Sequence, residues 1–183
     1  EGTMFFVLVV LVGVGVFLCL KRCRKKLPRR AVFSFDVKTN GGQWGEPFAI
    51  AALVYDEGGM EMAKFSGEYP KNYQDYDALL RAFATFYLAN KKGVDVIVHM
   101  GYIAEARLLR DMHDRRLIGD YDAPYPLYDI NGTFQAAGED PTSVEKYLKR
   151  HGLSVDDFGG GALDPLYNCA ATAAAYRHLN RWK

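Results

Sequence analysis

The sequence predicts a mixed α/β domain carried by one N-terminal transmembrane helix, and three observations support this. Residues Met4 to Leu20 form an uncharged apolar run that has no equal elsewhere in the chain. Three apolar segments between 31 and 66 are separated by glycine turns, which indicates an antiparallel three-strand meander. Helical and strand-like periods then alternate, which adds parallel strands to the same sheet and places helices on both faces. We expect a transmembrane anchor at 1–20, a basic juxtamembrane linker at 21–30 and one domain at 31–183.

The apolar run suits a single membrane crossing. At 1.5 Å per residue it reaches roughly 26 Å as a helix, slightly less than a hydrocarbon core of about 30 Å. The basic side chains that follow can extend to the headgroups and supply the missing length; they are Lys21, Arg22, Arg24, Lys25, Lys26, Arg29 and Arg30. This cluster predicts that the C-terminal domain lies on the positive, cytosolic or matrix, side. A secretory signal peptide would instead carry its positive charges before the apolar run.

Charge separates the two parts of the chain and limits the partners of the domain. The chain has 23 Lys and Arg against 22 Asp and Glu, but seven of the basic residues lie in 21–30 and one acidic residue is Glu1. Residues 31–183 therefore hold 16 basic and 21 acidic residues, a net charge of about −5. Nucleic-acid binders normally show a basic surface, so we expect no nucleic acid partner. Lipid headgroups account better for the basic cluster.

The predicted strands are short, and most are bounded by turn residues. In the first, apolar and polar side chains alternate up to the turn Asn40-Gly41-Gly42. The second ends at an Asp-Glu-Gly-Gly turn, after which the alternation resumes. The five expected strands are 31–39, 47–55, 60–66, 94–99 and 126–130.

Four segments have the period of a helix. In 74–92 the apolar side chains fall on one stripe, and Lys91, Lys92 and Gly93 end it favourably. Thr142 and Glu145 match a capping box for a helix at 144–152. The other two expected helices are 104–116 and the alanine-rich 165–182.

Cysteines and histidines do not predict a metal centre. Cys19 and Cys23 are either acylated or ordinary residues at the membrane boundary, and Cys169 lies far from both. The run of three glycines from Gly159 lacks the following Lys and Ser or Thr of a phosphate loop. We therefore expect no cofactor, no bound metal and no small-molecule substrate. The four histidines are scattered, at His99, His113, His151 and His178, and we expect the last two on helix surfaces.

Four segments occur in a recognisable order: FSFDVKTNGG, HMGYIAEARLL, LYDINGTF and LDPLYNCAATAAAY. They resemble the motifs of the DEDD 3′-5′ exonucleases of the ribonuclease H-like superfamily, in the branch with a catalytic histidine. The resemblance runs from about Ala31 to the C-terminus and implies a ribonuclease H-like fold. In that family four carboxylates hold two divalent metals about 4 Å apart, and the histidine acts as general base.

Most of the family's catalytic residues are replaced in this chain. By the match, Asp36 is the one retained carboxylate, Lys38 stands in place of its partner glutamate, and the third motif aligns around Asp129. Glu105 lies beside the position of another lost aspartate. The resemblance therefore implies an inactive site without its general base. The degenerate positions are Asp36, Lys38, Ala104, Leu163 and Asn168.

Lys38 is more than a neutral replacement. Positions i and i+2 of a strand share a face, so its ammonium lies where a metal cation would sit. We hypothesise that Lys38 pairs with Asp36 and substitutes electrostatically for the missing metal. The competing interpretation is an ordinary solvated strand face. Residual activity would need Glu105 to stand in for Ala104, or Asp164 to stand in for Asn168.

These observations favour a non-catalytic accessory or scaffold subunit, anchored in a membrane and surrounded by neighbouring protein subunits. An organellar respiratory complex, in the mitochondrial inner membrane, or a virion with an internal membrane would suit it. The alternatives are a membrane-tethered 3′-5′ exonuclease with a remodelled metal site and a nucleic-acid-binding module that keeps the groove.

The segment at 121–128 is rich in aromatic residues and prolines. It is either an exposed surface that packs on another protein or a loop folded over its own core. The residues concerned are Tyr121, Pro124, Tyr125, Pro126 and Tyr128.

Overall fold

A five-stranded mixed sheet forms the centre of the domain. The computed structural model describes residues 31–42, 44–156 and 158–180, all within one compact unit. The strand order is β3-β2-β1-β4-β5; the first three strands are antiparallel, and β4 is parallel to β1 and β5. This arrangement confirms the predicted meander with added parallel strands. The strands are β1 (Ala31–Asn40), β2 (Glu46–Tyr55), β3 (Glu61–Glu68), β4 (Val94–Val98) and β5 (Leu127–Asp129).

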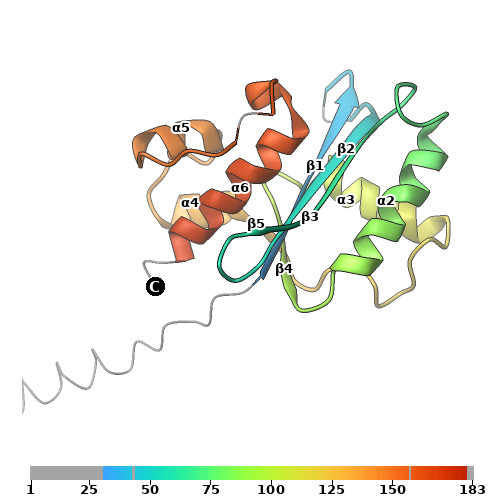
Figure 1. Ribbon diagram of the computed structural model, residues 1–183, viewed down its shortest axis with the longest axis horizontal. Helices are drawn as coiled ribbons and strands as arrows, with labels where there is room; N and C mark the ends of the chain where they lie inside the picture. Colours follow the sequence, from blue (N-terminus) through green and yellow to red (C-terminus); the bar gives the residue numbers. More distant parts are fainter. Residues whose placement is uncertain (1–30, 43, 157, 181–183) are drawn as a thin grey trace, which may run out of the picture. The chain divides into compact units, whose positions relative to one another are not determined.

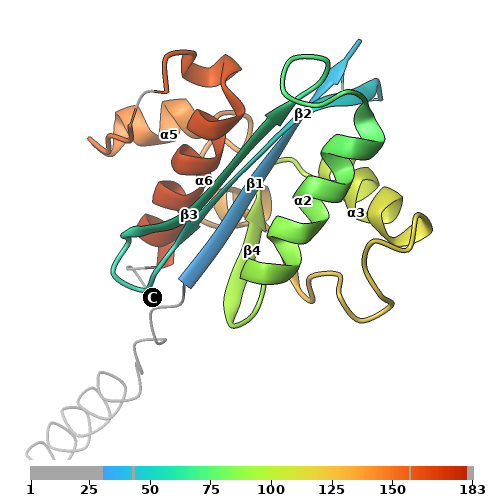
Figure 2. The ribbon, with the colours of Figure 1, turned by 45° about the vertical axis from the view of Figure 1, so that its right-hand side comes forward.

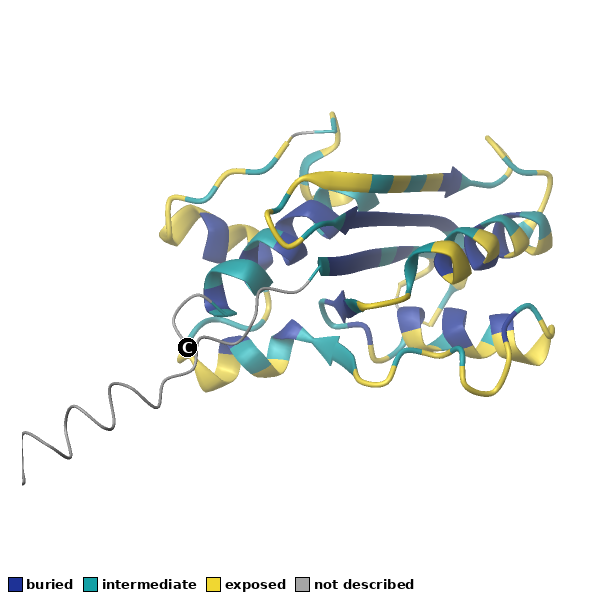
Figure 3. Cartoon of the chain, turned by 60° about the horizontal axis from the view of Figure 1, so that its bottom comes forward, coloured by how far each residue is buried: buried dark blue, intermediate teal, exposed yellow. Residues whose placement is uncertain are grey.

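Helices cover both faces of this sheet (Figures 1 and 2). On one face lie α2 (Tyr76–Asn90) and α3 (Ala104–Asp114). On the other lie α4 (Ile130–Ala136), α5 (Val144–Arg150) and α6 (Pro165–Asn180). A short 3₁₀ helix, η1 (Gly161–Leu163), comes before α6. Burial is concentrated in β1 and β2, whereas the edge strand β3 and the outer sides of the helices are more exposed (Figure 3).

Strand β1 contributes to the core on each side of the sheet. Phe33, Phe35 and Val37 pack into the cluster that contains α2 and α3. Val32 packs into the cluster that contains α4, α5 and α6. Because side chains alternate along a strand, the even-numbered Asp36 and Lys38 lie on the α6 face with Val32.

The predicted capping box is wrong by one residue. The N-cap of α5 is Ser143, whose Oγ accepts a hydrogen bond from the Lys146 backbone N–H at 3.2 Å. The Thr142 hydroxyl donates to the Asp140 carboxylate at 2.6 Å and is not available to the helix. Both Ser and Thr are good N-caps. Ser143 is the N-cap here because the Thr142 hydroxyl is bonded to the nearby Asp140 carboxylate.

The predicted strand at 126–130 is also shorter than expected. β5 has three residues, and Ile130 already belongs to α4. Asp129 ends the strand because its side chain caps the helix, accepting from the Asn131 backbone N–H at 3.0 Å. The Asn-Gly pair that follows is typical of a turn and conceals this short helix.

In the aromatic segment at 121–128, some side chains are exposed and others pack on the domain's own core. Tyr121 and Tyr125 are fully exposed. Tyr128 instead packs against α6, with its ring centroid 6.1 Å from that of Tyr176. Of the two histidines expected on helix surfaces, His151 is exposed but lies at the C-cap of α5. His178 lies in α6, is half-buried and shares a 2.7 Å hydrogen bond with the Tyr147 hydroxyl.

The predicted membrane helix and basic linker, at 4–20 and 21–30, lie outside the described residues. Among the residues that are described, no helix combines the length and apolar character needed to cross a bilayer. The anchor remains a prediction from the sequence.

Candidate functional site

The candidate site forms where β1 extends past β4. Strand β4 pairs only with Ala31 to Ser34 of β1, so the rest of β1 has no strand partner on that side. The backbone N–H of Val37 lies in this stretch and donates to Glu105 Oε1 at 3.0 Å. Glu105 is in the first turn of α3 and is only 5% exposed. The short β4 therefore brings a carboxyl group of α3 beside the strand that carries Asp36.

Lys38 occupies the centre of this site. Its Nζ lies 3.1 Å from Asp36 Oδ2, which confirms the predicted pair, and the two side chains are 27% and 18% exposed. We assign the Asn168 amide so that its oxygen accepts from Lys38 Nζ at 2.6 Å and its nitrogen donates to the Ala162 carbonyl at 3.2 Å. In the opposite orientation the Asn168 amide nitrogen would face Lys38 Nζ, and both groups are donors. Asn168 would then keep only 3.4 Å contacts to the Asp36 carboxylate. The ammonium thus links β1 to α6.

Burial and charge set the protonation of the two carboxyl groups. Burial raises the pKa of Asp36, and the Lys38 ammonium opposes that shift by favouring the ionised form. Burial raises the pKa of Glu105 to about 8, and the charge of Asp36 acts in the same direction. At neutral pH Glu105 therefore mainly holds its proton.

The donor set does not fit the two metals of the resembled family. One carboxylate already faces an ammonium group, the second is largely neutral at pH 7, and Asn168 offers an uncharged amide. Divalent cations of the magnesium kind need several anionic oxygens that are free to coordinate. Within the described part of the chain, no cluster of three or more His, Cys, Asp or Glu side chains is arranged to hold a metal ion.

The other predicted site positions lie apart from this pair or serve the fold. Leu163 is 87% exposed, and Ala104 is buried at the start of α3. Asp164 accepts from the Leu166 backbone N–H at 2.8 Å, which orders the start of α6. Asp129 accepts from the backbone N–H groups of Met100 and Gly101, both at 3.0 Å, and holds the turn after β4. Both aspartates therefore order the backbone around them.

A small cavity beside Asp36 contains residues that sequence reasoning missed. Its volume is about 150 Å³. His99 lines it and donates through Nε2 to the Pro141 carbonyl at 2.9 Å, which holds the imidazole in place. His99 begins the second matched segment, so its position after a buried strand was a usable signal. Other lining residues gave no signal: Thr142, Ser143, Tyr167 and Thr172.

Comparison with known proteins shows a similarity to solved structures. No family model matches the chain, and no curated protein matches it. Among solved structures, the chain is similar to a product-bound structure of exonuclease I, with 14% identity and a TM-score of 0.47. The match covers 84% of this chain and 46% of that chain, so this chain spans about half the length of the solved protein.

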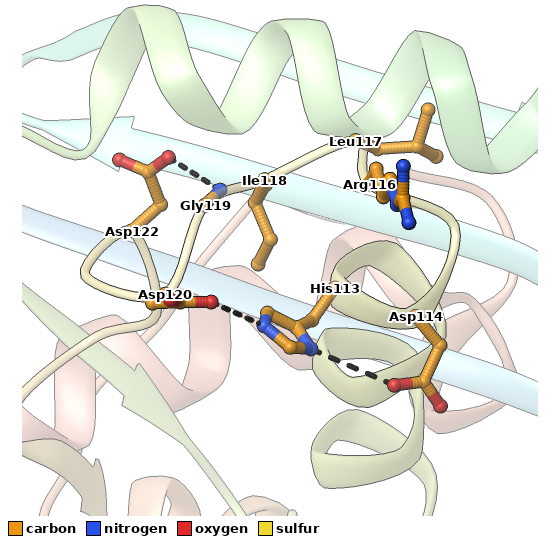
Figure 4. A pocket seen from close by; sticks show the side chains of 8 residues that line it. All are labelled: His113, Asp114, Arg116, Leu117, Ile118, Gly119, Asp120 and Asp122. Carbon is orange, nitrogen blue, oxygen red and sulfur yellow. Dashed lines mark hydrogen bonds and ion pairs between the residues drawn. The ribbon is translucent and has the colours of Figure 1, made fainter.

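A second pocket, of about 590 Å³, lies at the C-terminal end of α3 (Figure 4). His113 is held there between Asp114, at 3.5 Å, and Asp120, at 2.9 Å. These two carboxylates raise the pKa of His113. The groups are exposed and paired with one another, and none of them belongs to the cluster around Asp36. This pocket therefore offers no reactive group to the candidate site.

The buried Glu105 predicts a pH dependence of stability. Its pKa is about 8 in the folded chain and near 4.5 when unfolded, so the folded state binds the extra proton between those values. The free energy of unfolding should fall by up to about 4 kcal/mol as pH rises from about 4.5 to about 8. Glu105→Gln still accepts from the Val37 N–H and should flatten this fall. Urea denaturation at several pH values measures it.

Glu61→Gln provides the control, because Glu61 is exposed on β3 and should leave the pH profile unchanged. A Glu105→Gln profile as steep as that of the unmodified chain would contradict the assignment.

Proposed function

We propose that this chain is a non-catalytic, membrane-anchored accessory or scaffold subunit of a large membrane-associated assembly, such as an organellar respiratory complex or a virion. The observation that carries the proposal is the Lys38 ammonium, 3.1 Å from Asp36 and 2.6 Å from the Asn168 amide oxygen. A fixed cation in this position removes the charge that would attract a divalent metal. The fold remains useful after such a change because function belongs to the site and not to the architecture.

The ammonium also supplies a structural contribution that a metal would otherwise make. Without a cation, Asp36 would carry its charge in a poorly hydrated position with no partner. Lys38 offsets this cost of burial and joins β1 to α6 through Asn168. The domain can therefore fold without binding a metal ion.

The sequence before the domain supports the membrane part of the proposal. An apolar run at 4–20 followed by seven basic residues suits a single anchor with its C-terminal domain on the positive side. The acidic balance of residues 31–183 favours protein neighbours over nucleic acid.

A nuclease assay tests the loss of catalysis. The full chain in mild detergent, incubated with labelled single-stranded DNA or RNA and manganese, should leave the strands intact. The physical reason is that Asp36 is paired and Glu105 is largely protonated, so no activated water forms. Gel electrophoresis over several hours measures the result.

One observation favours a second candidate, a membrane-tethered exonuclease with a remodelled metal site. Glu105 places another carboxyl group next to Asp36, where it could serve as a ligand once ionised. Manganese-dependent digestion that increases above pH 8 and disappears in Asp36→Asn would establish this candidate and defeat the first.

A further inference from the structure

An open pocket of about 240 Å³ lies between the β1–β2 turn and α3. Trp44 of the turn is 81% exposed, and Tyr102 just before α3 is 62% exposed. A single exposed aromatic side chain needs no explanation, but two that line one pocket are typical of a binding surface. The lining residues are Trp44, Tyr102, Ile103, Ala106, Arg107 and Arg110, and none of them lines the cavity beside Asp36.

The two walls of this pocket are joined to each other. Arg107 Nη1 donates to the Gly45 carbonyl at 3.1 Å, which ties the turn to α3. Arg107 Nε also lies 3.8 Å from the Asp111 carboxylate one turn further along the helix. A pocket whose walls are fixed before binding loses less conformational entropy when a ligand arrives.

The charge of the pocket is opposite to that of the domain around it. Arg107 and Arg110 line it, and no acidic side chain does. Arg110 makes no ion pair with any described residue. Residues 31–183 as a whole carry a net charge of about −5. An acidic ligand is therefore attracted to this pocket and repelled by most of the remaining surface.

We propose that this pocket docks an acidic segment of a neighbouring protein that carries an aromatic side chain. Its ring packs between Trp44 and Tyr102, and its carboxylates pair with the guanidinium group of Arg110. Trp, Tyr and Arg are the residues that most often dominate binding energy at protein interfaces. The proposal rests on the proposed function and deepens it by naming the chemistry of one partner. A single-stranded nucleic acid fits less well, because its long run of phosphates would meet an acidic domain.

Fluorescence anisotropy with a defined probe tests the surface. The probe is a fluorescein-labelled peptide with one central tyrosine flanked by aspartates and glutamates, added to the full chain in non-ionic detergent. We expect saturable binding that weakens with salt. Trp44→Ala and Arg110→Glu should each raise Kd about tenfold or more. Arg81→Glu, an equal charge change on the exposed side of α2, should change Kd less than about twofold.

Four results would overturn the proposal. Two concern the peptide: Trp44→Ala binds it as tightly as the unmodified chain, or a peptide with lysines in place of the acidic residues binds equally well. The other two are tighter binding of single-stranded RNA and self-association of the chain that Trp44→Ala abolishes. The nuclease assay on the same preparation separates the two proposals. Digestion together with specific peptide binding would defeat the inactive site alone, and intact strands without peptide binding would defeat this surface alone.

Discussion

The double substitution Lys38→Glu with Asn168→Asp should create a manganese site. It removes the ammonium and places two new carboxylates beside Asp36 and Glu105, so that anionic oxygens converge from β1, α3 and α6. At a manganese concentration one hundred times Kd, binding should raise the free energy of unfolding by about 2.7 kcal/mol. Without metal the variant should be less stable than the unmodified chain, because like charges then repel. Thermal denaturation with and without manganese, together with isothermal titration, measures both effects.

Two controls isolate the carboxylates as the cause. Lys38→Gln removes the ammonium without adding a ligand and should gain no manganese binding. Lys149→Glu makes the same charge change as Lys38→Glu, but on the exposed side of α5, and should also gain none. If the double variant folds, as judged by circular dichroism, and manganese still does not stabilise it, the assigned geometry is wrong.

Lys38→Met alone should destabilise the domain by about 2 to 3 kcal/mol at pH 7. Breaking a buried ion pair leaves the other charge uncompensated, and the effect here is below the usual range because both side chains are partly exposed. Without the ammonium the pKa of Asp36 rises further, so the folded variant takes up a proton more readily than the unfolded chain. Its deficit should therefore shrink as pH falls toward 5. Urea denaturation at both pH values measures this change.

The double variant Asp36→Asn with Lys38→Met should recover most of the lost stability, because no charge is then left unpaired. Lys71→Met is the control for an exposed ion pair. It breaks the 3.7 Å pair with Glu68, in which the side chains are 72% and 41% exposed, and should cost less than about 1 kcal/mol. Equal losses in Lys38→Met and Lys71→Met would show that the pair with Asp36 has no special role.

The arrangement of strands and helices could be predicted wherever the pattern was local and long. The alternation of apolar and polar residues in β1 and the apolar stripe of α2 are both long enough to show their period. That period identified the first as a strand and the second as a helix. The boundary between β5 and α4 could not be predicted, because three strand residues are followed at once by a helix that Asp129 caps. The N-cap of α5 depended on Asp140 taking the Thr142 hydroxyl, a contact that no periodicity reveals.

Part of the candidate site could also be predicted from local pattern, and part could not. The pairing of Asp36 with Lys38 followed from the two-residue repeat of a strand and is found in the structure. The role of Glu105 depends on β4 being too short to reach Val37, which is a property of the folded sheet. The orientation of Asn168 depends on the carbonyl of Ala162, six residues earlier in η1. The pocket at Trp44 joins segments about sixty residues apart in sequence, and nothing local indicated it.

Electron paramagnetic resonance of manganese tests whether Lys38 keeps a metal out of the site, because the signal of the free hydrated ion falls when the ion binds a protein. In a titration of the full chain at pH 7, we expect the free-ion signal to stay the same with and without protein. A saturable loss of that signal, abolished in Asp36→Asn, would show that the Lys38 ammonium does not take the place of a metal.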